Sequence, residues 1–146
     1  MIKNNMVGIL LDTNIYGKIV EREENSEIAE KILDLRKDGR IVIPNFKVIR
    51  DEVRNARSNE ILKLYDSLTA NSIHVVDNKV EKLADLYFKK YRDKGGIQKK
   101  TTNFMNDLRI VAFATIKNVN IVCSEDAKAF HTNLARETYR EVNLGF

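Results

Sequence analysis

Short apolar runs alternate along this chain with longer segments whose apolar residues recur at helical spacing. The runs at 7–12, 40–44, 73–76 and 120–124 are four to six residues long. Strands that are buried on both faces read as continuous apolar runs, and parallel strands need a crossover, usually a helix, between them. The alternation therefore predicts an α/β fold, a three-layer α/β/α sandwich with a central, mostly parallel sheet of about five short strands.

The longer segments have the three- and four-residue apolar spacing that is typical of a helix. They are 26–38, 59–70, 79–92 and 103–118. Val48, Ile49 and Val53 have the same spacing in a shorter segment. The last stretch, TYREVNL at 138–144, alternates between apolar and polar residues, and we expect it to be the fifth strand, at an edge of the sheet.

Length and composition restrict the class of protein. A chain of 146 residues favours a single domain, 1–146, and its 43% hydrophobic and 32% charged residues are ordinary for a globular protein. The single cysteine, Cys123, excludes an internal disulfide and a cysteine-cluster metal site, and it indicates a reducing, cytoplasmic compartment. The apolar stretch near residue 7 is too short for a signal peptide, and no run of about eighteen apolar residues occurs, so neither a targeting segment nor a membrane span is expected.

Four acidic residues occur where the carboxyl ends of parallel strands would lie. Asp12 ends the run at 7–12, Glu52 follows the second run, and Asp126 follows the fourth. Asp107 is near the start of the helix that leads into the fourth strand, and a helix antiparallel to the strands begins at their carboxyl edge. Ligands of open α/β sheets bind outside this edge. We therefore expect the four carboxylates to converge there.

The spacing around the acids distinguishes them from their neighbours. Apolar residues follow Asp107 three, four and seven positions later, so this acid shares the core-facing stripe of its helix. Glu52 continues the apolar spacing of its own segment, whereas Asp51 is offset toward solvent. In the SED stretch at 124–126, we choose Asp126 over Glu125.

Carboxylates that gather at one edge need a compensating charge. Two carboxylates about 4 Å apart repel by about 4 kcal/mol at an effective dielectric constant of about 20. Hard oxygen ligands without clustered His or Cys suit Mg²⁺ or Mn²⁺. Such a site can activate water and stabilise charge on a phosphodiester. The two histidines, His74 and His131, are far apart in the sequence and receive no role.

The motifs that carry these acids resemble those of a known family, the PIN-domain nucleases, especially the short VapC-type toxins and their stand-alone relatives. The matching pieces are LLDTN at 10–14, IVIPNFKVIRDEV at 41–53, NDLRIVAFA at 106–114 and IVCSEDAKAF at 121–130. They follow the family's order nearly from end to end, and the first and third are the most specific. Two details depart from the family pattern. Ser124 stands where a threonine is usual, and Phe130 follows Asp126 by four positions instead of three.

The resemblance implies a metal-dependent endoribonuclease that uses Mg²⁺ or Mn²⁺. The catalytic and metal-binding quartet that it implies is Asp12, Glu52, Asp107 and Asp126. It also implies that Asn14 and Ser124 support the metal ligands through hydrogen bonds. The short single-domain form suggests the toxin of a toxin–antitoxin pair, with an antitoxin protein as partner, and the family suggests a homodimer.

A basic segment, KKYRDKGGIQKK at 89–100, precedes Asp107 in the chain. Together with the formal net charge of +4, it is compatible with a polyanionic partner. We expect Lys94, Lys99 and Lys100 to contact the phosphate backbone of RNA. The alternative is a solvated helix end followed by a loop.

Two other functions compete with the nuclease hypothesis. A haloacid-dehalogenase-type phosphatase also begins with an aspartate after a buried strand, but it needs a second aspartate two residues later, where this chain has Asn14. A catalytically inactive RNA-binding or assembly module could keep the same fold, and the loss of one acid would have favoured it. The complete set of four acids favours the nuclease.

Overall fold

The computed structural model describes residues 6–21, 26–124 and 133–145. The chain divides into two compact units, and each is described by itself. The first unit contains Met1–Val75 and Asn118–Glu125, and the second contains Val76–Lys117 and Asp126–Phe146.

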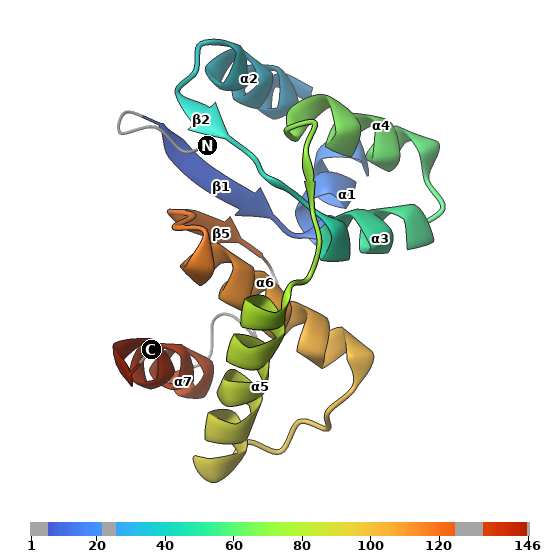
Figure 1. Ribbon diagram of the computed structural model, residues 1–146. Coiled ribbons are helices and arrows are strands. Elements are labelled where there is room, and N and C mark those ends of the chain that lie inside the picture. Colours follow the sequence, from blue (N-terminus) through green and yellow to red (C-terminus); the bar gives the residue numbers. More distant parts are fainter. Residues whose placement is uncertain (1–5, 22–25, 125–132, 146) are drawn as a thin grey trace. The chain divides into compact units, whose positions relative to one another are not determined.

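The first unit contains a three-stranded parallel sheet with the strand order β2-β1-β5 (Figure 1). Its strands are β1 (Val7–Leu11), β2 (Ile41–Val42) and β5 (Ile121–Cys123). Gly8 pairs with Val42 on one side of β1, and Leu10 pairs with Val122 on the other. The central strand is therefore the one that leads directly to Asp12. Leu10 and Leu11 of this strand are buried, as its continuous apolar run predicts.

A second, two-stranded parallel sheet lies in the same unit. It consists of β3 (Asn45–Phe46) and β4 (Ile73–His74). β3 begins directly after Pro44, and both of its residues are buried. The Tyr65 hydroxyl donates a hydrogen bond to Oδ1 of Asn45 at 2.8 Å, which satisfies part of this buried amide.

Four helices complete the first unit. They are α1 (Thr13–Glu21), α2 (Ser26–Lys37), α3 (Lys47–Asn55) and α4 (Asn59–Leu68). α1 packs against the other three helices, as Figure 1 shows. Tyr16 of α1 and Tyr65 of α4 lie edge to face with ring centroids 5.2 Å apart, and both rings are fully buried.

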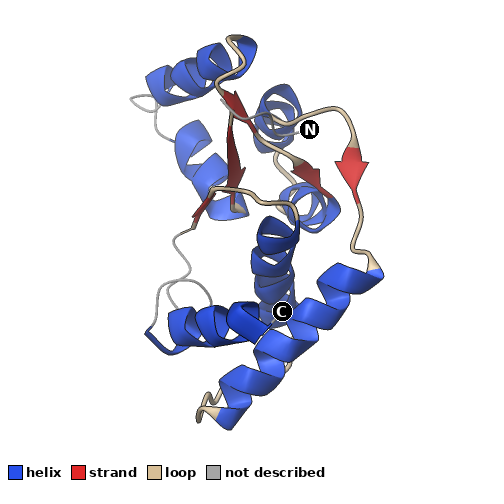
Figure 2. Ribbon diagram, turned by 60° about the vertical axis from the view of Figure 1, so that its left-hand side comes forward, coloured by secondary structure: helices blue, strands red, loops and turns tan. Residues whose placement is uncertain are grey.

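The described residues of the second unit form helices and loops, as Figure 2 shows. The helices are α5 (Asn78–Asp93), α6 (Thr102–Ile116) and α7 (Asn133–Gly145). Side-chain caps fix two of their amino ends: Asp77 accepts from the N–H of Val80, and Thr101 accepts from the N–H of Phe104. α5 packs against both α6 and α7. No helix in the described part of the chain is both long and apolar enough to cross a membrane.

These observations confirm the predicted α/β class and the parallel pairing. The four apolar runs contain β1, β2, β4 and β5, and the four longer predicted helices are present with ends that differ by at most two residues. Two elements were not predicted, the helix α1 and the short strand β3.

The prediction of an edge strand at 138–144 is wrong, because this stretch belongs to α7. Its contacts with α5 explain the helix. Thr138 is fully buried, the ring of Tyr139 lies edge to face with Tyr87, and Asn143 accepts a hydrogen bond from the Tyr87 hydroxyl at 2.7 Å. Tyr139 and Asn143 are four residues apart, so they lie on one face of a helix, and this packing overrides the weak alternating pattern.

Candidate functional site

Asp12 directly follows the central strand β1, and its side chain is only 5% exposed. Its N–H donates to the carbonyl of Cys123 at 2.9 Å, which extends the pairing with β5 by one residue. Its carboxylate accepts two hydrogen bonds, one from the N–H of Thr13 on Oδ1 at 2.8 Å and one from the Ser124 hydroxyl on Oδ2 at 2.9 Å. Burial of an ionised carboxylate requires such bonds. Neutral donors therefore hold the carboxylate at the end of the strand.

Thr13 connects Asp12 to the second predicted acid. While its N–H binds Asp12, its hydroxyl donates to Oε2 of Glu52 at 3.1 Å. Glu52 is half-buried and belongs to α3. The structure thus brings together two acids that are forty positions apart in the sequence, with one threonine between them.

The buried face of α3 determines where Glu52 lies. Val48, Ile49 and Val53 are buried, and Glu52 follows the first two by four and three positions, so it borders this face. Asp51 instead forms an ion pair with Lys47 at 2.7 Å, and both side chains are about half exposed. The helical spacing in the sequence had placed Glu52 beside the apolar face and Asp51 toward solvent, and both acids have these positions in the structure.

The structure does not describe the other two predicted acids together with this pair. Asp107 lies on α6 in the second unit, where it is half-buried and flanked by the buried residues Phe104 and Ile110, three positions away on either side. Asp126 lies outside the described residues. Among the residues that are described, no three His, Cys, Asp or Glu side chains form a group that could hold a metal ion.

The two predicted supporting residues have different positions. Ser124 follows β5 and binds the carboxylate of Asp12. Asn14 is exposed on the first turn of α1. Sequence reasoning missed Thr13, which contacts both acids. The signal for it was present in the LLDTN motif, where a hydroxyl residue directly follows the aspartate.

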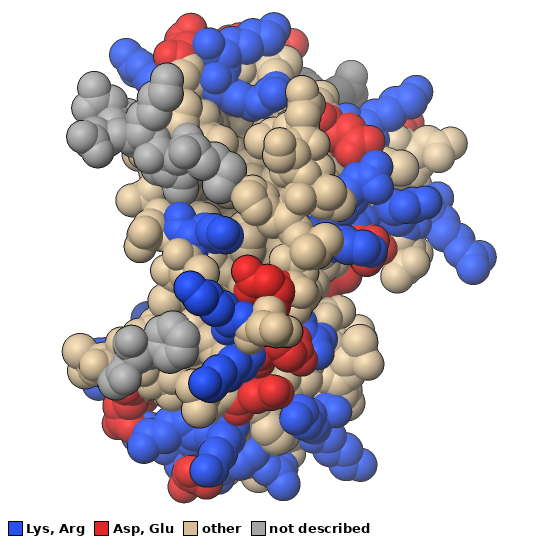
Figure 3. All heavy atoms as spheres, in the orientation of Figure 1, with Lys and Arg blue, Asp and Glu red and all other residues tan. Residues whose placement is uncertain are grey.

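Two of the three predicted RNA-binding lysines form ion pairs within the second unit. Lys94 lies 2.7 Å from Oε1 of Glu141, and Lys100 lies 3.4 Å from Oδ1 of Asp85. Hydrogen bonds from Lys94 and Lys90 lower the pKa of Glu141. Figure 3 shows Lys and Arg side chains around the carboxyl end of α5, with Asp and Glu side chains among them. The basic segment is thus partly neutralised by local acids, while Lys99 is exposed.

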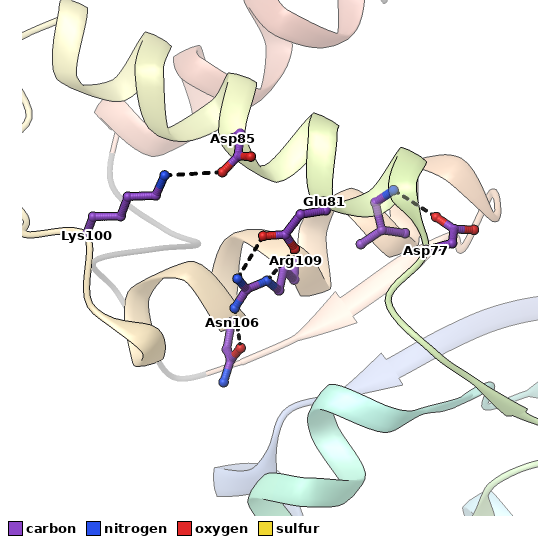
Figure 4. Close-up of polar contacts among 7 residues, drawn as sticks. Asp77, Glu81, Asp85, Lys100, Asn106 and Arg109 are labelled. Carbon is purple, nitrogen blue, oxygen red and sulfur yellow. Dashed lines mark hydrogen bonds and ion pairs between the residues drawn. The ribbon is translucent and has the colours of Figure 1, made fainter.

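The arginine in the NDLRIVAFA motif has a structural contact. Arg109 of α6 donates two hydrogen bonds, at 2.8 and 2.9 Å, to the carboxylate of Glu81 on α5 (Figure 4). A third bond reaches Oδ1 of Asn106 at 2.8 Å. The bonds between Arg109 and Glu81 lower the pKa of Glu81 and raise that of Arg109. The bidentate pair ties α5 to α6 in the region that carries Asp107.

The donor set around Asp12 suits a hard divalent cation. Asp12 and Glu52 provide carboxylate oxygens, and hydroxyl groups orient them. Burial raises the pKa of the nearby Cys123 thiol, which disfavours its thiolate form. Oxygen ligands without thiolate are those that Mg²⁺ and Mn²⁺ prefer.

Comparison with known proteins does not assign this chain to a family. No protein-family model matches the sequence, and neither a curated protein nor a solved structure matches it significantly. The features that bear on function are therefore the acid pair, the hydroxyl groups that hold it, and the motifs of the sequence.

Proposed function

We propose that this protein is a PIN-like, metal-dependent endoribonuclease that hydrolyses RNA phosphodiester bonds with water. One observation carries the proposal: a buried aspartate at the end of the central parallel strand is linked through Thr13 to Glu52 and held by Ser124. The parallel β2-β1-β5 sheet with helices around it agrees with the PIN-like sandwich that the motifs suggest. Asp107 and Asp126 complete the proposed acidic quartet.

The hydroxyl groups around Asp12 give this carboxylate a fixed orientation. Each of its oxygens accepts one hydrogen bond from the described residues, and a carboxylate has about four lone-pair sites. Lone pairs therefore remain for another ligand. Since both donors are neutral, they position Asp12 without cancelling its negative charge. A site of this kind is prepared for a cation.

Asp12 and Glu52 would hold the cation, with Asp107 and Asp126 as the further ligands of the proposed quartet. When bound, Mg²⁺ or Mn²⁺ lowers the pKa of water and stabilises negative charge on a phosphodiester. Thr13 fixes the position of the Asp12 carboxylate relative to the Glu52 carboxylate, because it donates a hydrogen bond to both. Ser124 prevents rotation of the Asp12 carboxylate.

A catalytically inactive RNA-binding module with the same fold is the second candidate function. It would use the same fold and the basic segment at 89–100 without cleaving RNA. A haloacid-dehalogenase-type phosphatase is less favoured. It requires a carboxylate at position 14, where the chain has an exposed asparagine.

The decisive experiment is cleavage of single-stranded RNA by the purified chain with Mg²⁺, with Mn²⁺ and with a chelator. We expect metal-dependent cleavage that Glu52→Gln abolishes. Asp51→Asn is the matched control, because Asp51 is the adjacent residue and its carboxylate pairs with Lys47 instead. RNA binding without cleavage would support the inactive module. Hydrolysis of nitrophenyl phosphate without RNA cleavage would support the phosphatase.

The biological setting is a further part of the proposal. We propose a cytoplasmic toxin that acts as a homodimer and is neutralised by an antitoxin protein. The neighbouring gene tests this role directly. A small adjacent gene whose product binds the purified chain and blocks its RNA cleavage would support a toxin–antitoxin pair, and a product that leaves cleavage unchanged would contradict it.

A further inference from the structure

A pocket of about 300 Å³ lies beside the acid pair, entirely within the first unit. One wall is a face of α1 formed by Thr13, Asn14, Gly17 and Lys18. These residues lie at positions i, i+1, i+4 and i+5 of the helix, which share one side. The opposite wall contains Ile61 of α4 and Ala56, which directly follows α3.

The pocket adjoins the candidate active site at Thr13. This residue lines the pocket, and its hydroxyl also donates to Glu52. The pocket then follows α1 as far as Glu21, which lies eight residues beyond Thr13, or about 12 Å along the helix axis. A part of a substrate that enters the pocket would therefore lie next to the part that is bound near Asp12 and Glu52.

Gly17 is the residue that keeps this pocket open. It lies in the interior of α1, where glycine is less favourable than alanine. The fold does not require glycine here, because its φ is not positive and an added Cβ would meet only Cδ1 of Ile61, at 3.8 Å, among the described atoms. By contrast, a Cβ on Gly96 would clash with the ring of Tyr91. The helix thus contains an unfavourable residue at a position where a side chain would narrow the pocket.

The walls of the pocket suit a flat ring with a polar edge. Gly17, Ala56 and Ile61 provide apolar surface, while Asn14 offers both an amide donor and a carbonyl acceptor. Asparagine recognises base edges in this way, and single-stranded RNA can turn its bases outward into such pockets. Lys18 and Glu21 line the same pocket with opposite charges, so the pocket has no excess positive charge that would favour a second phosphate. The chemistry of the pocket therefore fits a nucleobase.

We propose that this pocket binds the base of the nucleotide next to the scissile phosphate and sets the base preference of cleavage. The inference rests on the proposed ribonuclease function. Asn14 then acts as a specificity residue that contacts the substrate base. Gly17 acts by leaving space for the ring.

The test uses Gly17→Ala in the full chain. Cleavage sites are mapped in a single-stranded RNA pool of random sequence with Mn²⁺, and binding of the four ribonucleoside 5′-monophosphates is measured with a chelator. We expect the wild type to prefer one base beside the cut and to bind its monophosphate most tightly. Gly17→Ala should reduce both preferences by about tenfold, which is typical of one extra carbon in a pocket. It should also raise the melting temperature by about 2–5 °C.

A compensating variant separates loss of space from other effects. Ile61→Val deletes Cδ1, the atom nearest to the added Cβ, so Gly17→Ala with Ile61→Val should regain most of the base preference. Ala70→Val is the matched control, since Ala70 lines a different pocket of the same unit, together with Asn45 and Arg50. This control should leave the base preference unchanged.

The two proposals fail in different ways. If the wild type cleaves RNA but Gly17→Ala keeps the same base preference, the pocket inference is overturned and the nuclease function stands. If the wild type does not cleave but binds one monophosphate selectively, and Gly17→Ala weakens that binding, the base-binding role of the pocket is supported while the nuclease function and its base preference fail. Cleavage with no base preference at any neighbouring position also overturns the inference.

Discussion

Asp12 in the first unit and Glu81 in the second are carboxylates with different kinds of partner. Asp12 is buried and accepts hydrogen bonds from a backbone amide and a hydroxyl group, both neutral. Glu81 is partly exposed and accepts two bonds from the guanidinium of Arg109. A charge held by neutral donors remains available to a cation, whereas a charge paired with arginine is already compensated. The contrast distinguishes an acid suited to bind a ligand from one that joins two helices.

Two buried tyrosines extend this comparison. Tyr16 in the first unit and Tyr87 in the second are both fully buried, and burial raises the pKa of both hydroxyls. The Tyr87 hydroxyl bonds to Asn143 and lies 3.2 Å from the Thr115 hydroxyl. The Tyr16 hydroxyl has no hydrogen-bond partner among the described residues. Within the described part of the unit that contains the candidate site, one buried polar group is therefore uncompensated.

The largest expected effect comes from removing the charge of Asp12. Asp12→Asn should lower RNA cleavage by more than about 100-fold, because loss of a mere supporting contact to a metal ligand already costs about 10–100-fold. Glu81→Gln is the corresponding change in the second unit and should leave the rate at saturating RNA unchanged. Initial rates with Mg²⁺ measure both, and circular dichroism checks the fold. Equal losses of cleavage rate in the two variants would contradict the assignment of Asp12 as a ligand-binding acid and of Glu81 as a structural one.

Removing the Ser124 hydroxyl should have a smaller effect of the same kind. Ser124→Ala deletes the bond to Oδ2 of Asp12 and leaves the carboxylate in place. We expect cleavage to fall by about 10–100-fold, with a higher Mg²⁺ concentration needed for half-maximal rate. Ser124→Thr retains the hydroxyl and should restore most of the activity. A metal requirement unchanged in Ser124→Ala would show that this bond does not orient a metal ligand.

The two tyrosines should respond to loss of the hydroxyl in opposite directions. Tyr16→Phe removes a buried group without a partner, so it should raise the free energy of unfolding by about 1 kcal/mol. Tyr87→Phe removes the donor that binds the side-chain oxygen Oδ1 of Asn143, and it should lower the free energy of unfolding by about 1 kcal/mol. Urea unfolding of both variants measures the difference. If Tyr16→Phe is also destabilising, its hydroxyl has a partner in the native protein.

Local patterns in the sequence were sufficient for some of these features. The unbroken apolar run before Asp12 identified a buried strand and the acid at its end, because a strand that is buried on both faces has apolar residues at every position. The helical spacing around Glu52 distinguished it from Asp51 for the same local reason. The placement of Asp12 and of Glu52 within their own elements was therefore predictable.

Features that depend on contacts between distant segments were not predictable in this way. The bridge from Thr13 to Glu52 joins α1 to α3, and no spacing within either helix reveals it. The stretch at 138–144 is helical because of its contacts with Tyr87. Lys94 was predicted to contact RNA, yet its closest charge is a glutamate of α7, an element that the sequence pattern did not indicate as a helix.

The smallest expected effect is the contribution of the Glu81–Arg109 pair to stability. The bonds from Arg109 lower the pKa of Glu81 in the folded state, so the pair stabilises the fold above the pKa that Glu81 has in the unfolded chain. This stabilisation is lost as the pH falls through the lowered pKa. Because Glu81 is 40% exposed, we expect only about 0.5–1 kcal/mol. Urea unfolding at pH 7 and at successively lower pH should therefore show Glu81→Gln less stable than the wild type at pH 7, with a difference that shrinks in acid. A difference independent of pH would mean that packing of the side chain, and not its charge, joins α5 to α6.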